Sequence, residues 1–150
     1  MRPLTVFGIS NLIGASIAPW CDARFGSGRV IILARAAYPI AWLVVAIAAP
    51  TGVGITLLFV ALALQGLAAS VENSNEMGYW QALTPDALLG RVNATRRSIN
   101  RTMAALGALI AGLLVGLIGD RPTLIAVITA FAAAALTAAL SPLRDAPIRD

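Results

Sequence analysis

Two acidic residues, Glu72 and Glu76, have the type and spacing that could perform chemistry in this sequence. They are four residues apart, which places both carboxylates on one face of a helix. If that face points into a helix bundle, lost hydration and mutual repulsion would favour protonation of one carboxyl, as a proton-coupled antiporter requires. The alternative, which we favour, is that the two glutamates pair with Arg96, Arg97 or Arg101 across the following loop.

Arg35 is the one charged residue inside the long apolar segments of the chain. A charge in the hydrocarbon layer costs about 2.5–3.5 kcal/mol on insertion scales, so such a residue is a candidate functional residue. Arg35 is about 9 Å beyond Arg29 along a helix, a distance that its long side chain can span to reach the membrane surface. We therefore expect Arg35 to extend to the interface, with a buried ion pair as the alternative.

The rest of the sequence excludes most catalytic and metal chemistry. The chain has no histidine and one cysteine, Cys21, so it lacks the residues for a histidine-based triad, a disulfide framework or a cysteine-ligated metal. No glycine-rich phosphate loop follows a strand, and no serine lies in a nucleophile elbow. We expect no enzymatic activity, no cofactor and no metal ion.

The composition is that of a membrane protein. Of the 150 residues, 59% are hydrophobic and 12% are charged, whereas about 25% of the residues of a soluble domain are charged. Although the net charge is +4, the eleven basic residues are spread among apolar segments and do not form a groove that follows a phosphate backbone. We therefore expect the lipid bilayer, and no nucleic acid, as a partner.

Five apolar segments are each about long enough to cross a hydrocarbon layer of about 30 Å, which takes about 20 helical residues. They lie at residues 3–19, 30–49, 52–70, 102–119 and 122–140. They lack the strict alternation of barrel strands, so the predicted fold is an all-α, polytopic integral membrane protein with one transmembrane domain. The first segment also has the outline of a signal peptide, but Ser10, Asn11 and the arginines that follow favour a span.

The arginines predict the orientation of these segments. One side of the membrane holds the connections 20–29 and 72–101 and the tail 141–150, while the other side has only Arg2 and Arg121. The first side has eight arginines: Arg24, Arg29, Arg91, Arg96, Arg97, Arg101, Arg144 and Arg149. Because cytoplasmic loops are enriched in basic residues, we expect a multi-pass protein of the cell (inner or plasma) membrane with its N-terminus outside and its C-terminus in the cytoplasm.

The connection 72–101 contains further predicted helical structure. The third segment is expected to continue as a helix to about Ala82, and a new helix is expected to begin near Asn93. Between them we predict a short surface helix. Its signals are an N-cap residue, a proline and an acidic residue in the first turn, and a glycine that ends the helix. The residues that give these signals are Thr84, Pro85, Asp86, Gly90 and Arg91.

Two segments have small residues at every fourth position, a spacing that lets helix backbones approach closely in lipid. The fourth segment has Ala104, Ala108, Gly112 and Gly116, and the fifth has Ala126, Ala130, Ala134 and Ala138. This spacing predicts tight helix contacts.

Four aromatic residues near predicted span ends are typical of an interfacial belt. They are Tyr38, Trp42, Tyr79 and Trp80.

Two loops resemble those of the major facilitator superfamily. Residues 18–30, Ala-Pro-Trp-Cys-Asp-Ala-Arg-Phe-Gly-Ser-Gly-Arg-Val, resemble the loop between its eighth and ninth helices. Residues 81–95, Gln-Ala-Leu-Thr-Pro-Asp-Ala-Leu-Leu-Gly-Arg-Val-Asn-Ala-Thr, are similar to its loop between helices ten and eleven, most of all in the branch with enterobactin exporters and macrolide efflux proteins. In the first loop Ala23 stands where members usually have an acid. We therefore interpret Arg24, Gly26, Gly28 and Arg29 as a structural turn, with a gating charge relay as the weaker hypothesis.

The resemblance covers essentially the whole chain and implies helices eight to twelve of a twelve-helix fold. It implies the C-terminal portion of a secondary-active efflux transporter for drug-like or siderophore-like small molecules, driven by protons and incomplete without its N-terminal helices. The alternative function is a small membrane protein that acts by helix association, either with a separately encoded transporter half or with a second copy of itself.

Overall fold

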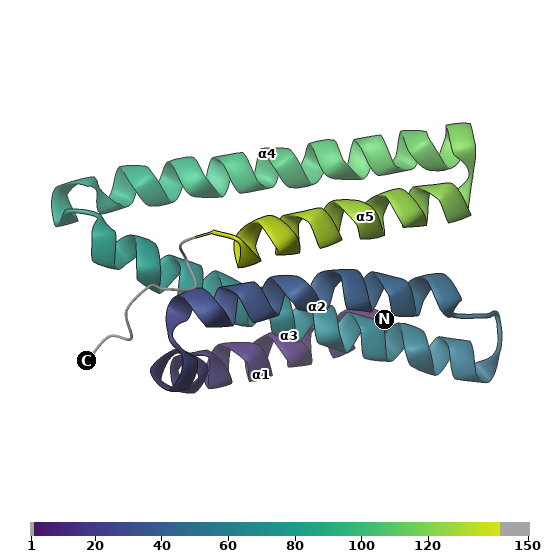
Figure 1. Ribbon diagram of the computed structural model, residues 1–150, viewed down its shortest axis with the longest axis horizontal. Helices are drawn as coiled ribbons and strands as arrows, with labels where there is room; N and C mark the ends of the chain where they lie inside the picture. The colour runs from purple at the N-terminus through teal and green to yellow at the C-terminus, as the bar shows by residue number, and fades with distance from the viewer. Residues whose placement is uncertain (1, 142–150) are drawn as a thin grey trace.

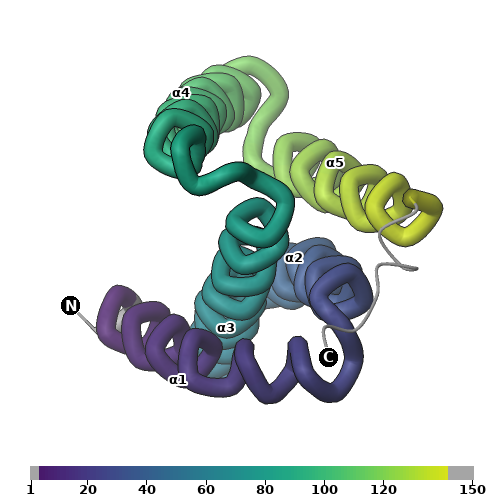
Figure 2. The backbone as a smooth tube through the Cα atoms, turned by 90° about the vertical axis from the view of Figure 1, so that its left-hand side faces the viewer, coloured from purple at the N-terminus to yellow at the C-terminus, as the bar shows by residue number. Residues whose placement is uncertain are grey.

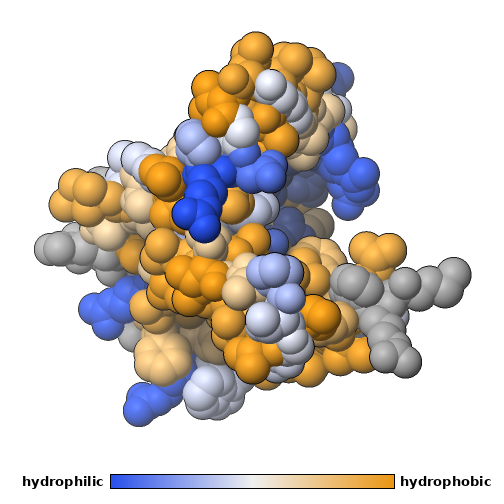
Figure 3. All heavy atoms as spheres, turned by 90° about the vertical axis from the view of Figure 1, so that its right-hand side faces the viewer, coloured by the Kyte–Doolittle hydropathy of each residue, from blue (hydrophilic) through white to orange (hydrophobic). Residues whose placement is uncertain are grey.

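The computed structural model describes residues 2–141, which form five helices joined by short turns (Figure 1). The helices are α1 (Arg2–Phe25), α2 (Ser27–Ile47), α3 (Gly52–Leu83), α4 (Asp86–Ile118) and α5 (Asp120–Ala139). Each is long and apolar enough to cross a membrane. Apolar side chains also dominate the visible surface in Figure 3, as expected for contact with lipid. The prediction of an all-α fold is confirmed, and the chain is a multi-pass membrane protein.

The helices extend beyond the predicted spans and take up most of the predicted connections. α1 continues through Pro19 to Phe25, and Gly26 alone separates it from α2. Gly26 has a φ of 81°, in the left-handed region that glycine enters without the steric penalty of a Cβ atom. The connection 72–101 is divided between α3 and α4. The tail after residue 141, with Arg144 and Arg149, lies outside the described residues.

The prediction of a separate short helix that ends at Gly90 is wrong. α4 begins at Asp86 and passes through Gly90, Arg91 and Asn93 without a break. A glycine inside a helix costs about 1 kcal/mol relative to alanine, which is less than the loss of several consecutive backbone hydrogen bonds. The predicted extension of the preceding helix to about Ala82 is confirmed, because α3 ends at Leu83.

Thr84 is not the N-cap of α4. Its hydroxyl donates a hydrogen bond to the carbonyl of Trp80 at 2.7 Å, so it closes the end of α3 instead. Pro85, rather than Thr84, precedes the first helical residue of α4. The two residues therefore form the bend at which the chain passes from α3 to α4.

α1 and α3 run in the same direction and pack backbone against backbone. A Cβ atom added at Gly14 would lie 2.8 Å from the carbonyl oxygen of Leu67, and one added at Gly66 would lie 2.8 Å from the carbonyl oxygen of Phe7. In lipid, helix contacts rely on van der Waals packing rather than on a hydrophobic driving force. This close approach is therefore what joins α1 to α3.

A row of small residues on α1 makes this approach possible. Ser10, Gly14 and Ala18 recur every four residues, and all three are buried. This row was not among the predicted packing stripes, because Ser10 is polar and the spacing is less regular in residue type than the alanine and glycine rows of the last two segments. Ala18 also packs with Val30 of α2 and Val71 of α3, so the row leads into the small apolar core that the three helices share.

α4 and α5 form a second helical hairpin that runs opposite to the α1–α2 hairpin. Gly119, with a φ of 85°, closes it at the end of the molecule opposite to Gly26 (Figure 1). α5 packs against α2, whereas α4 packs against α5 and stands away from α1 (Figure 2). No residue of α4 is buried. The structure thus consists of a three-helix unit and a hairpin that is fastened to it mainly through α5.

Substitution of Gly14 by alanine should destabilise the protein, because the added methyl group would collide with the backbone of α3. We expect the free energy of unfolding to fall by about 1–3 kcal/mol, as is usual for overpacked sites. Thermal unfolding of the purified protein in detergent measures the change. Gly8→Ala is the matched control: a Cβ atom there meets nothing within 4 Å, so this variant should be unchanged or slightly stabilised. Equal effects of the two substitutions would contradict the α1–α3 contact.

Candidate functional site

One arginine in the bundle binds two glutamates of a neighbouring helix. Arg35 of α2 donates from Nε to Oε1 of Glu72 at 2.7 Å, and from Nη2 to Oε1 of Glu76 at 2.7 Å. The two glutamates are one turn apart on α3, about 6 Å along the helix axis. The planar fork of a guanidinium is suited to this geometry, since its donors point in fixed directions toward two acceptors.

Two further side chains extend this cluster to a third helix. The hydroxyl of Tyr38, on α2, donates to Oε2 of Glu72 at 2.8 Å. Nη2 of Arg96, on α4, donates to Oε2 of Glu76 at 2.8 Å. The guanidinium of Arg96 also lies 5.7 Å from the centre of the Trp80 ring, within the range of a cation–π interaction. We call Arg35, Tyr38, Glu72, Glu76 and Arg96 the ionic network.

The ionic network is balanced in charge and in hydrogen bonds. Two guanidinium groups face two carboxylates, and each of the four carboxylate oxygens accepts a hydrogen bond. The charged side chains are between 16% and 32% exposed. Because partly buried charges are costly unless paired, this complete pairing is what allows four ionisable groups to lie among apolar helices.

The structure decides between the alternatives that the sequence left open. Arg35 was expected to extend to the membrane surface, but it forms the ion pairs of the second interpretation, because α2 and α3 pack side by side and bring both glutamates within reach. Glu76 binds Arg96, one of its three expected partners, whereas Glu72 binds Arg35 instead. Arg97 and Arg101 take no part in the ionic network.

Sequence reasoning missed Tyr38 as a member of the network, since it was assigned to an aromatic belt. The signal was available: Tyr38 is three residues after Arg35 and therefore shares its helix face. Its ring also stacks on Phe131 of α5, with ring centres 5.3 Å apart, and Trp42 lies 6.5 Å from the same ring. These aromatic contacts join α5 to α2, so the network and the α5 interface share Tyr38.

The residues of the first loop motif flank or form the one-residue turn at Gly26, with Arg24 in α1 and Gly28 and Arg29 in α2. Gly26 and Gly28 are buried, and the Ser27 hydroxyl donates a hydrogen bond to the carboxylate of Asp22 across the turn. Arg24 and Arg29 are exposed. The geometry thus agrees with the interpretation of this loop as a structural turn, and it places none of these residues in the ionic network.

The small-residue stripe of α4 makes no contact of the kind the sequence predicted. Ala104, Ala108, Gly112 and Gly116 are all exposed, and a Cβ atom added at either glycine would meet nothing within 4 Å. On α5, Ala138 is buried, whereas the three other alanines of its stripe are exposed. Since α5 packs against α2 through a different face, where Phe131 stacks on Tyr38 and Trp42, the spacing of small residues did not identify the interface within residues 2–141.

The site holds charges of both signs on three helices, and its ion pairs join α2, α3 and α4. In residues 2–141 there is no group of histidine, cysteine and acidic residues that could hold a metal ion. Comparison with protein-family models, with curated proteins and with solved structures found no match to this chain. A function for this chain is therefore inferred from its own sequence and geometry.

Replacement of Arg35 by glutamine should destabilise the fold more than loss of an exposed arginine. Both glutamates would lose a charged donor, and we expect the free energy of unfolding to fall by about 1.5–3 kcal/mol, the range for hydrogen bonds to charged groups. Thermal unfolding in detergent measures this effect, with the exposed Arg29→Gln as control. The further substitution Glu72→Gln should restore part of the lost stability. If the double variant is as unstable as the sum of the single variants, the ion pair is contradicted.

Proposed function

We propose that the chain is the C-terminal portion of a secondary-active efflux transporter of the major facilitator superfamily, completed by helices outside this sequence. The substrate class would be drug-like or siderophore-like small molecules, as the loop resemblance implies. The observation that carries the proposal is the exposure of α4, which has no buried residue although it is long and apolar enough to span a membrane.

The two hairpins support a pair of inverted three-helix units, one of which lacks its third helix in this chain. The α1–α2 hairpin turns at Gly26 and the α4–α5 hairpin turns at Gly119, at opposite ends and in opposite directions. α3 packs against both helices of the first hairpin. Transporters of this superfamily are built from inverted three-helix repeats. The same arrangement around the second hairpin would place one further helix against α4 and α5.

The small-residue stripe of α4 is a suitable packing surface for this further helix. It has the same four-residue spacing of small side chains as the row on α1 that receives α3. Gly112 and Gly116 leave the α4 backbone open to close approach. Large apolar residues such as Ile110 and Leu113 occupy another face of α4 and suit contact with lipid. The helix partner would thus bind on the small-residue face.

The ionic network is a suitable coupling element for proton-driven transport. Protonation of Glu76 would remove one of the two negative charges and leave Arg35 and Arg96 in excess. The hydrogen bond from Arg96 to Glu76 joins α4 to α3, so its loss would weaken the connection between these helices. A proton could in this way change the position of α4 relative to α3, which is the kind of bistable contact that alternating access requires.

Efflux measurements test the proposed function. Cells that lack other exporters would express this chain alone or with the polypeptide encoded upstream, and accumulation of a lipophilic dye and of a siderophore would be measured. We expect efflux only from the combined polypeptides, because α4 alone lacks its partner. Efflux by this chain alone would contradict the need for further helices, and no efflux in either case would contradict transport.

Two variants in the same assay separate assembly from coupling. Gly112→Leu should abolish efflux by blocking the helix partner, whereas Leu113→Phe adds volume about 100° around the helix and should leave efflux in place. Glu76→Gln should remove the pH dependence of efflux, while Asp120→Asn, which removes an equal charge at the far end of the molecule, should retain it. Unchanged pH dependence in Glu76→Gln would contradict the coupling role.

The same exposed stripe favours one alternative function, in which the chain acts by helix association without transport. A second copy of the chain would then cover α4. Cross-linking through a cysteine at Ala108, in a Cys21→Ser background, distinguishes the two functions. Cross-links between copies in the absence of any other polypeptide support self-association, whereas cross-links only to an upstream polypeptide support the transporter.

We also propose that the N-terminus lies outside the cell and that the turn at Gly26 lies in the cytoplasm, because arginines gather at that end of the bundle. An exposed cysteine at Ala23, again in a Cys21→Ser background, tests this orientation. It should react with a membrane-permeant thiol reagent and resist an impermeant one added to intact cells. Rapid reaction with the impermeant reagent would reverse the proposed orientation.

A further inference from the structure

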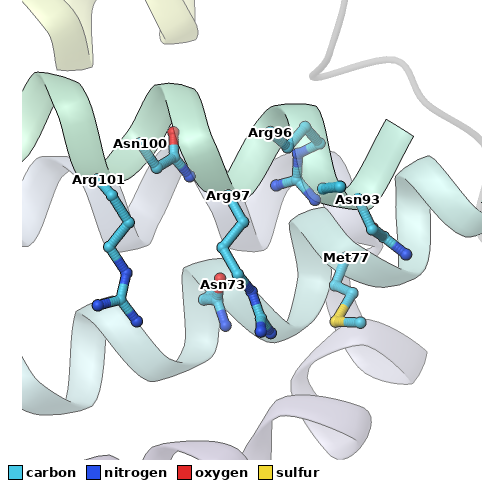
Figure 4. Close-up of a pocket in the computed structure, with 8 residues that line it drawn as sticks. Asn73, Met77, Asn93, Arg96, Arg97, Asn100 and Arg101 are labelled. Carbon is cyan, nitrogen blue, oxygen red and sulfur yellow. The ribbon is translucent and has the colours of Figure 1, made fainter. Parts of the chain in front are cut away.

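A polar cleft of about 730 Å³ lies between α3 and α4 and shares Arg96 with the ionic network (Figure 4). Arg97 and Arg101 extend from α4 toward α3, where Asn73 lies between them in this view. Asn93 and Asn100 add side-chain hydrogen-bond donors to the lining of the cleft, and Met77 adds apolar contact area. The cleft exists because α4 touches α3 mainly through Arg96 and not through packed apolar faces.

The cleft has an excess of positive charge. Of its three arginines, Arg96 binds Glu76, whereas Arg97 and Arg101 have no ion-pair partner within the part of the chain that the structure describes. No carboxylate lines the cleft, and its asparagine side chains can each donate a hydrogen bond. Such a combination of guanidinium and amide donors is complementary to a phosphate group.

The position of the cleft along the helices places it at a membrane–water boundary. Arg101 directly precedes the apolar segment that begins at Thr102, and Asn73 follows Ser70, the last residue of the apolar segment of α3. Both helices therefore leave the hydrocarbon layer at the same level. Headgroup phosphates of a bilayer lie at this depth, whichever side of the membrane the cleft faces.

We propose that the α3–α4 cleft binds a phosphate group, with Arg97 and Arg101 as its principal ligands. The phosphate would come from the headgroup of an anionic phospholipid or from a soluble phosphate compound. Arg97 and Arg101 are one helical turn apart and can bind separate phosphate oxygens. Met77 and Ala94 add apolar contact area at the edge of the cleft, which suits the glycerol part of a lipid. Phosphate binding in this cleft does not require that the chain transports a substrate.

Lipid retention measured by native mass spectrometry tests the site. The purified protein would be exchanged into detergent with phosphatidylglycerol or phosphatidylcholine, and the bound lipid would be counted. We expect phosphatidylglycerol to bind, and Arg97→Gln/Arg101→Gln to weaken its binding about thirtyfold, or about 2 kcal/mol, since two charge-assisted contacts with the phosphate would be lost. Arg24→Gln/Arg29→Gln removes the same charge from exposed positions and should bind as the parent protein does.

Competition with inorganic phosphate distinguishes the two sources. If millimolar inorganic phosphate displaces phosphatidylglycerol from the parent protein, the site accepts a free phosphate compound; if it does not, the lipid headgroup is the ligand. Equal lipid binding by the Arg97→Gln/Arg101→Gln variant and the Arg24→Gln/Arg29→Gln variant would overturn the proposal, as would equal retention of phosphatidylcholine. Circular dichroism and gel filtration confirm that both variants remain folded, and Arg101→Gln alone gives a milder test.

Discussion

The pairing of charges inside an apolar bundle is the constraint on which this structure depends. Arg35 can lie among membrane-spanning helices because Glu72 and Glu76 bind it from one face of α3. Those glutamates in turn need every donor that surrounds them, including the hydroxyl of Tyr38 and the guanidinium of Arg96. Since an unpaired charge in such surroundings is costly, the network sets the register of α2 against α3 and the position of α4.

The helices of this protein are joined in two physically different ways. α1 and α3 approach until their backbones touch at Gly14 and Gly66, so their contact relies on dispersion and shape. α4 has no such contact with α3 and is held to it mainly by a charged hydrogen bond. A contact of the first kind does not respond to protonation, whereas one of the second kind does. This difference is the physical basis of the proposed coupling role of the network.

Neighbouring arginines on α4 have separate roles because a helix turns by about 100° per residue. Arg96 is ion-paired with Glu76 where the ionic network meets the polar cleft, while Arg97 lines the cleft without joining the network. The glycines of the stripe further along α4 lie on an open face that suits a backbone partner. One helix thus presents an ion pair, a cleft that we propose binds phosphate and a surface that we propose receives another helix, and the ion pair is the one formed within residues 2–141.

The sequence by itself determined the helical, membrane-spanning class of the protein, because the length and apolarity of a segment are local properties that decide whether it crosses a bilayer. It also identified Glu72, Glu76 and Arg35 as the residues that could carry function, since charges are rare in such segments. Only the tertiary structure decided that Arg35 joins the two glutamates, that Tyr38 belongs with them and that α1, not α4, uses its small residues within this chain. These outcomes depend on which faces of helices meet, and that is set by contacts between residues far apart in the sequence.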